Sequence, residues 1–491
     1  MTPVDSHLSI QRGSPGAAAP WHAPSDPSDD GPAPRPNARG ECSAALLELL
    51  HRAPGSDAGP LVELLRGAVS TTDIRGDDLQ LSLWVLYALH LHGLEAVDEA
   101  WEWDPGLVAA ARVLEDAFEQ SLRAEAYDLI DRARLESRSD DPSRLEPVRA
   151  PLLALTRLDL GPSMSRWIAT RANLAQVREF LVLKSIYQLK EADPHTFAIP
   201  RLQGRAKAAA VEIQADEYGG GDPPAVHAAL FARAMREAGL SDRIGGYVDH
   251  VPASVLAADN AAVMFGLHRR LRGAIVGHLA AIEMTSTIPM RRYAAGIARV
   301  GLSVDVAAYF HEHVMADAAH EQVALHDLVR PFVRSNPARG GDVLFGAAAA
   351  MMLDAAFARE AITAWEEGRS ALRARASEPW DDGSGPERGF WTGGDREART
   401  DRSPTVERAA APDAGPAAGD EPASAEGPVS TTGITVCQDG PLLVRGPVPI
   451  TRTDGGPVEA TRRTIALCRC GRSGTKPHCD GTHHKVGFTA P

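Results

Sequence analysis

Apolar residues recur at helical spacing along most of the chain. The segments AALLELLHRA, GPLVELLRGAV and DDLQLSLWVLYALHLHGL carry them three or four positions apart, with Gly or Pro near their ends. A similar helix is expected from Leu107 to Ile130, and no period-two alternation appears before about residue 370. This pattern predicts an all-α helical domain over residues 42–369.

Two segments differ sharply from this pattern in composition. Residues 1–41 are rich in Pro, Gly, Ser and Asp, and residues 370–430 in Pro, Ala, Gly and acidic residues. Neither contains enough large apolar side chains to offset the entropy of an ordered chain. We therefore expect a disordered N-terminal arm and a disordered linker.

A second, smaller domain is expected after the linker, over residues 431–491. Its short segments ITVCQ, PLLVRGPVPI and TIALCRC are separated by DG and DGG turns. Short apolar runs between such turns are typical of strands. This tail is therefore predicted to be mainly β.

Composition and charge exclude several classes of partner and location. Acidic residues outnumber basic ones by 65 to 51, and the formal net charge is −14. Such a chain lacks the basic surface that binds nucleic acid or an anionic membrane. The N-terminus lacks the pattern of a signal peptide, and we find no apolar run of the roughly 20 residues that a membrane helix needs. We expect a cytoplasmic protein.

One predicted helix carries candidate metal ligands. In YFHEHVMADAAHEQVALH, Tyr309 to His326, the residues His313, Asp317 and His320 are separated by four and three positions. On a helix these offsets place two imidazoles and a carboxylate within about 60° of one another. Iron favours such ligands, although a solvated helix with scattered histidines shows the same spacing.

Further ligands come from two earlier segments. Glu217 and His227 flank a GGGDPP break that could turn His227 back toward Glu217, although a glutamate before glycines is often a solvated helix end. Glu283 lies among apolar residues in a helix predicted to be buried. A buried carboxylate needs a partner, which is either a metal or an arginine such as Arg272.

These segments together resemble a known family. EIQADEYGGG, GHLAAIEMTS and FHEHVMADAAHEQ are similar to the iron-containing redox enzymes, whose fold is like that of heme oxygenase. The similarity runs from about Asp77 to about Trp365. It implies two non-heme iron ions held by Glu217, His227, Glu283, His313, Asp317 and His320. Some members carry a further upstream Glu that binds iron, and Glu191 is the nearest match here, although it could equally be a surface residue at a helix end. His195, His268, His278 and His311 could orient the ligands, although a core or surface histidine is the more common reading for each.

The tail contains the densest group of candidate ligands. CRCGRSGTKPHCDGTH presents Cys468, Cys470, Cys479 and His483 within 16 residues. Three thiolates and one imidazole could hold either zinc or an iron–sulfur cluster. The remaining cysteines, Cys42 and Cys437, lie outside this motif and have no assigned role.

The same stretch resembles the CDGSH iron–sulfur domain, the family of mitoNEET, from about Ile434 onward, with Thr482 in place of its Ser. The resemblance implies that Cys468, Cys470, Cys479 and His483 ligate one [2Fe-2S] cluster and that Asp480 caps the helix after it. It further implies that the β segments support a homodimer.

The two resemblances lead to a hypothesis about function. An enzyme that activates dioxygen needs electrons, and a [2Fe-2S] carrier in the same chain could deliver them to oxidise a small organic substrate. An external reductase would then recharge the cluster. The alternatives are a non-catalytic redox or iron sensor and, less favoured by six converging ligands, a heme-degrading enzyme.

Overall fold

The computed structural model describes residues 31–137, 147–373, 433–446, 448–451, 456–457 and 462–490. The described residues of the helical part and of the tail belong to one compact unit. The architecture confirms the predicted fold class, a helical domain followed by a small mainly-β tail. Most of the chain predicted as arm and linker lies outside the described residues.

The helical part is built from helices of very different length. Its first helices are α1 (Glu41–Leu50), α2 (Gly59–Thr71), α3 (Asp77–Ala88), α4 (Pro105–Glu136), α5 (Arg149–Leu155), α6 (Met164–Thr170), α7 (Leu174–Gln188) and α8 (Asp193–Thr196). They are followed by α9 (Gly204–Glu217), α10 (His227–Glu237), α11 (Ala253–Leu267), α12 (Arg272–Arg299), α13 (Val304–Gln322), α14 (Arg330–Ser335) and α15 (Gly340–Glu366).

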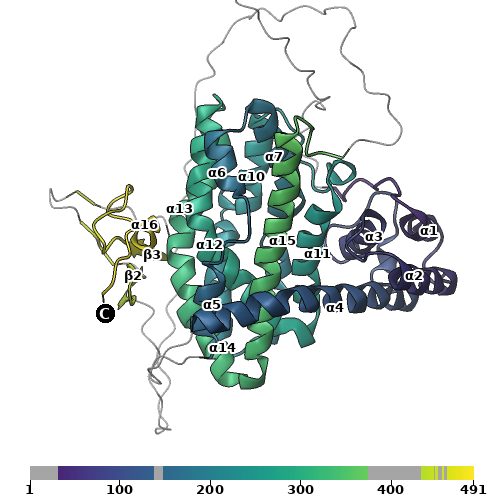
Figure 1. Ribbon diagram of the computed structural model, residues 1–491, viewed down its shortest axis with the longest axis horizontal. Helices are drawn as coiled ribbons and strands as arrows, with labels where there is room; N and C mark the ends of the chain where they lie inside the picture. Colours follow the sequence, from purple (N-terminus) through teal and green to yellow (C-terminus); the bar gives the residue numbers. More distant parts are fainter. Residues whose placement is uncertain are drawn as a thin grey trace, which may run out of the picture. The chain divides into compact units, whose positions relative to one another are not determined.

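The centre of the domain is formed by α12, α13 and α15. Helix α12 packs along both α13 and α15, and α4 crosses α15 (Figure 1). Two glycines allow α12 and α15 to approach closely. A Cβ at Gly277 would lie 1.9 Å from the carbonyl oxygen of Val343, and a Cβ at Gly346 would lie 1.8 Å from that of Ala274. No larger residue fits at either position without moving a backbone.

The helix predicted from Tyr309 to His326 has a different end. Helix α13 stops at Gln322, and a π-helix, η8 (Val323–Val329), continues the chain. A π-turn widens the helix and re-aims the side chains that follow it. His326 therefore does not continue the face that carries His313 and His320.

The prediction of a disordered arm over residues 1–41 is wrong for the last part of this segment. Ala33 is fully buried and forms a bridge with Leu94, and Asn37 bonds to Asp249. The side chain of Arg39 forms a salt bridge with Asp77. The partners in these contacts are far away in sequence. They hold in place a segment that its own composition would leave disordered.

One described helix, Pro337–Glu366, is long and apolar enough to cross a membrane, with a mean hydropathy of 1.4 in its most apolar window. However, 61% of that window is buried inside the protein. The helix contains α15, which packs against α4, α11 and α12. Its apolar composition is therefore accounted for by its place in the core.

The tail contains a three-stranded antiparallel sheet. Its strands are β1 (Gly433–Val436), β2 (Leu442–Arg445) and β3 (Thr464–Leu467), with β2 in the centre. In this register Val444 faces Ile434 on one side and Ile465 on the other. A short helix, α16 (Thr482–Lys485), follows the cysteine-rich loop.

Candidate metal centres

A first group of ligand atoms brings together four elements of the helical part. Glu191 follows α7, Glu217 ends α9, His227 begins α10 and His313 lies on α13. All four side chains are buried, and one ligand atom of each lies within 4.8 Å of the others. The Nδ1 of His227 is 2.8 Å from Glu217 Oε2, and the Nε2 of His313 is 3.5 Å from Glu191 Oε1.

The glycine-rich break places His227 in this group. Between α9 and α10 the chain forms two single turns, η4 (Gly219–Gly221) and η5 (Pro223–Ala225). All three glycines have positive φ, between 64° and 91°. Side-chain-bearing residues rarely adopt this conformation, so the glycines allow the reversal that returns His227 to Glu217.

A second group shares a residue with the first. Glu217, Glu283 on α12 and His320 on α13 also place ligand atoms within 4.8 Å of one another. The Nδ1 of His320 lies 3.3 Å from Glu283 Oε2 and 3.8 Å from both Glu217 Oε1 and Asp317 Oδ1. Asp317 is beside this group, and its Oδ2 accepts a hydrogen bond from Ser286. Glu217 thus stands between two adjacent sets of carboxylates and imidazoles.

In His313 and His320, one ring nitrogen forms a hydrogen bond and the other faces the group of ligand atoms. His313 uses Nδ1 to donate to the Tyr309 carbonyl, and His320 uses Nε2 to bond to Asp216 Oδ2 at 3.1 Å. Among the described residues, Glu191 Oε1, His227 Nδ1 and His320 Nδ1 are buried and close to other ligand atoms, but none is aligned for a hydrogen bond. Buried polar atoms of this kind are normally satisfied. Their convergence fits two metal ions.

The remaining oxygen of Glu191 is held by a chain of hydrogen bonds. Gln188 donates to the hydroxyl of Tyr309 at 2.8 Å, and that hydroxyl donates to Glu191 Oε2 at 2.6 Å. Such outer contacts orient metal ligands. They leave Glu191 Oε1 pointing at the first group.

Electrostatics at the groups reflect a crowded set of charges. Burial raises the pKa of Glu283 to about 7. Burial opposes the charged form of His313, yet the nearby carboxylates, Glu191 foremost, raise its pKa to about 10. These raised pKa values mean that Glu283 and His313 hold protons more tightly, and those protons offset the negative charge of the buried carboxylates. Metal ions at the same place supply that positive charge instead.

Four further histidines lie outside these groups. His195 and His278 are buried and lie 3.1 Å apart, and burial lowers the pKa of His195 to about 4. His268 contacts Glu115 at 2.7 Å, and His311 is exposed. None of the four contributes to either group in the described part of the chain.

The cysteine-rich loop forms a second kind of site. The sulfur atoms of Cys468 and Cys470 are 3.8 Å apart, and Cys479 Sγ is 3.4 Å from His483 Nδ1. Two backbone bonds of 2.8 Å, Cys468 to Pro477 and Cys479 to Ala466, join the segments that carry these residues. Asp480 accepts a bond from the Thr482 amide at the start of α16.

Two of the four residues have pKa shifts that suit ligation, whereas burial raises the pKa of the Cys479 thiol to about 12. Burial opposes the thiolate of Cys468, but the backbone at Ser473 and the thiol of Cys470 lower the pKa of that residue. Burial lowers the pKa of His483 to about 4, so its imidazole is neutral at neutral pH. A thiolate and a neutral imidazole are the forms that bind metals. Cys42 and Cys437 are buried elsewhere and keep no assigned role.

The tail contacts the helices that carry the two groups. His484 Nε2 lies 2.7 Å from Glu321 Oε1, and ligand atoms of Glu321, His483 and His484 lie within 4.8 Å of one another. Glu321 is the neighbour of His320 in α13. On the other side, Arg291 on α12 forms a 2.8 Å salt bridge with Asp480.

A second set of contacts joins the strands of the tail to the helices. Arg462, whose side chain is only 8% exposed, pairs with Glu312, and its Nη1 lies 3.7 Å from Asp216 Oδ2. The same Asp216 oxygen bonds to His320. Arg445 on β2 pairs with Glu212 and Asp327 at 2.9 and 2.6 Å.

Sequence reasoning missed Asp216, Glu321 and Arg462. Asp216 and Glu321 immediately precede or follow predicted ligands, Glu217 and His320. Their position next to predicted ligands was the one indication in the sequence. The neighbouring residues do not indicate that either side chain contacts the tail. Arg462 has no signal in the sequence, because its partners lie about 150 or more residues away.

Two family models match the parts of the chain that carry these sites. The family described as iron-containing redox enzyme matches residues 178–355, which include all the residues of the two groups. The family described as iron-binding zinc finger of CDGSH type matches residues 439–484. A CDGSH domain binds a [2Fe-2S] cluster, and the Glu and His groups fit two non-heme iron ions.

Part of the chain is similar to a curated nitrosourea synthase from Streptomyces achromogenes subsp. streptozoticus. It is 29% identical over 150 residues, which is 30% of this chain. The match spans only 31% of the length of that relative.

Proposed function

Because this chain combines a domain of the iron-containing redox enzyme family with a CDGSH-type [2Fe-2S] domain, we propose that it is a dioxygen-dependent oxidoreductase that oxidises a small organic molecule. In this proposal the helical part holds two non-heme iron ions, and the tail is their electron donor. The observation that supports it most is that Glu217 belongs to two adjacent, fully buried groups of carboxylates and imidazoles.

In the proposal, one iron is held by Glu191, Glu217, His227 and His313, and the other by Glu217, Glu283, Asp317 and His320. When bound, two irons with these nitrogen and oxygen ligands would supply redox chemistry with dioxygen. Glu217 would belong to both ligand sets. Tyr309 and Asp216 fix the orientation of Glu191 and His320 through their hydrogen bonds.

The electron-donor role is supported by the contacts of the tail. Glu321 follows His320 on α13 and reaches His484, which follows the cluster ligand His483 on α16. Arg462 approaches Asp216, which bonds to the other side of the same His320. A residue proposed to bind iron is therefore connected to the tail in two ways, through few intervening side chains.

Iron analysis of the full chain tests the sites separately. Wild-type protein should contain about four irons per chain, two in the helical part and two in the cluster. Cys479→Ala should remove the visible absorption of the cluster and leave two irons, whereas Cys437→Ala should keep all four. A Cys479→Ala protein without any iron would contradict two independent sites.

A pair of neighbouring arginines tests the electron-donor role. Arg462→Gln removes the contacts with Glu312 and Asp216, while Arg463→Gln changes an exposed neighbour of the same size. After chemical reduction of the cluster, the rate of electron transfer to the helical part should fall about tenfold or more in Arg462→Gln and stay unchanged in Arg463→Gln. Equal rates in both variants would refute the role of this contact.

Oxygen consumption separates an enzyme from a sensor. An oxidase or oxygenase should consume dioxygen faster when its substrate is present, whereas a sensor should be oxidised at a rate that is indifferent to added molecules. The relative is a nitrosourea synthase, so small nitrogen-containing molecules are the first substrate class to screen. If the protein is fully loaded with iron and no candidate substrate accelerates oxygen uptake, the result would favour a sensor.

A further inference from the structure

A large cavity opens on the helical part away from the two metal groups. It has a volume of about 1100 Å³ and is lined by the starts of α9 and α12, by η8 and α14, and by β1 of the tail. Arg205 and Glu217 lie near opposite ends of α9, 12 residues apart, which corresponds to roughly 18 Å along a helix. The cavity is therefore a site distinct from the proposed iron centre.

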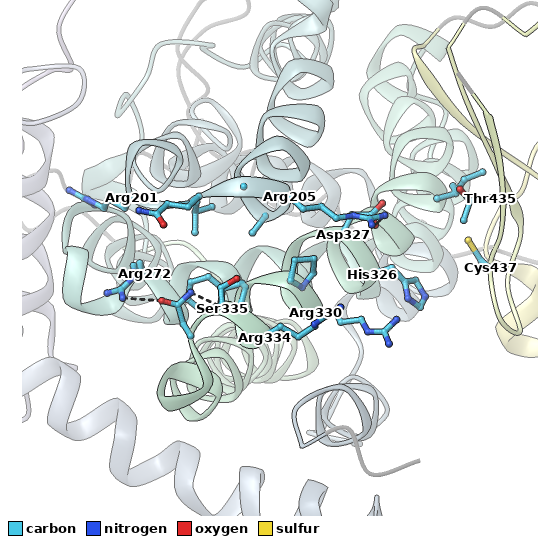
Figure 2. A pocket seen from close by; sticks show the side chains of 18 of the residues that line it. Arg201, Arg205, Arg272, His326, Asp327, Arg330, Arg334, Ser335, Thr435 and Cys437 are labelled. Carbon is cyan, nitrogen blue, oxygen red and sulfur yellow. Dashed lines mark hydrogen bonds and ion pairs between the residues drawn. The ribbon is translucent and has the colours of Figure 1, made fainter. Parts of the chain in front are cut away.

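The lining of this cavity is strongly basic. Figure 2 shows arginines from several elements around it, and together they are Arg201, Arg205, Arg269, Arg272, Arg330 and Arg334. Among the residues that the structure describes, Asp327 is the one acidic residue in the lining. This local charge is opposite in sign to the net charge of the chain, −14.

The single carboxylate does not neutralise this charge. Asp327 Oδ1 lies 2.7 Å from Arg205, and its Oδ2 lies 2.6 Å from Arg445 on β2. Both of its oxygens are therefore already paired with arginines. The other arginines of the lining gain nothing from it.

Two of the arginines are held by neutral acceptors. Arg201 donates to the carbonyls of Gly266 and Leu267, and Arg272 donates to Arg269 O and Asn336 Oδ1. These bonds fix the guanidinium groups without cancelling their charge. Burial together with neighbouring arginines lowers the pKa of both residues. In the described part of the chain, no carboxylate forms a salt bridge with Arg201, Arg269, Arg272 or Arg334.

From this arrangement we propose that the cavity binds a small organic anion that carries two or more phosphate or carboxylate groups. Guanidinium groups pair with both kinds of oxyanion through two parallel hydrogen bonds. Leu202, Phe332 and Leu443 supply an apolar part of the wall against which the organic body of the ligand packs. The volume suits a molecule of nucleotide size. A bound anion offsets the repulsion among the arginines.

Calorimetric titration of the full, iron-loaded chain tests the site with pyrophosphate and citrate as probes, at constant ionic strength. One of them should bind with one molecule per chain. Stronger binding of pyrophosphate assigns a phosphate ligand, and stronger binding of citrate a polycarboxylate. Either result supports the site.

The variant Arg269→Gln with Arg334→Gln removes two exposed arginines that have no carboxylate partner, so the fold should be kept. Binding should weaken at least tenfold. The control is Arg132→Gln on α4, whose side chain is 48% exposed and does not line the cavity. Binding that is absent for both probes, or that is equally strong in the double variant and in the control, would overturn the proposal.

Discussion

A buried ion pair beside Glu191 gives the sharpest prediction about stability. Lys190 follows α7 and pairs with Asp259 on α11, and each side chain is only 2% exposed. Burial raises the pKa of Asp259, whereas Lys190 acts to lower it. Replacing Asp259 by Asn would leave the ammonium group of Lys190 buried without a counter-charge.

The cost of that change follows from burial. Breaking a fully buried pair by removing one partner costs about 3–5 kcal/mol, while an exposed pair contributes at most about 1 kcal/mol. The chain also contains a more exposed pair, Lys184 with Asp354 at 3.1 Å, in which the lysine is 24% and the aspartate 61% exposed. We therefore expect a loss of about 3–5 kcal/mol in Asp259→Asn and less than about 1 kcal/mol in Asp354→Asn.

Urea denaturation followed by far-ultraviolet circular dichroism measures both losses in the iron-free protein. Iron content should also fall in Asp259→Asn, because Glu191 is the neighbour of Lys190. Replacing both partners with apolar residues, Lys190→Met with Asp259→Leu, should restore most of the stability. Equal losses in Asp259→Asn and Asp354→Asn would refute the reasoning.

Three further predictions concern the ligands, the packing and the pH dependence. His313→Ala should lose iron and the exposed His311→Ala should keep it, as measured by metal analysis; equal iron contents would contradict the ligand set. Gly346→Ala should lower the free energy of unfolding by about 1–3 kcal/mol through overpacking of α12 against α15, and an unchanged value in urea would contradict the close approach. Burial lowers the pKa of His195 to about 4 and that of His278 well below its ordinary value, so the unfolded chain takes up protons near pH 6.5 that the folded chain refuses. The free energy of unfolding should therefore fall more between pH 6.5 and 5 in the wild type than in His195→Gln, and equal changes in the two proteins would contradict it.

Several features of the sites could be predicted because they are local. His313, Asp317 and His320 share a helix, so their spacing alone places them on one face. The GGGDPP break predicted a reversal of the chain direction. In the structure this reversal brings His227 next to Glu217. The end of the same helix could not be predicted, because the π-turn after Gln322 is not visible in the apolar spacing.

The sequence by itself determined the helical domain, the β tail and two compact sets of candidate ligands, because helical periodicity and short loops fix the distances between residues that are close in the chain. Only the tertiary structure decided that Glu191 joins Glu217, His227 and His313. It also decided that Glu321 and Asp216 meet the tail, and that arginines from several elements surround one cavity. These residues are far apart in sequence. Their meeting depends on how whole helices pack, which no local pattern encodes.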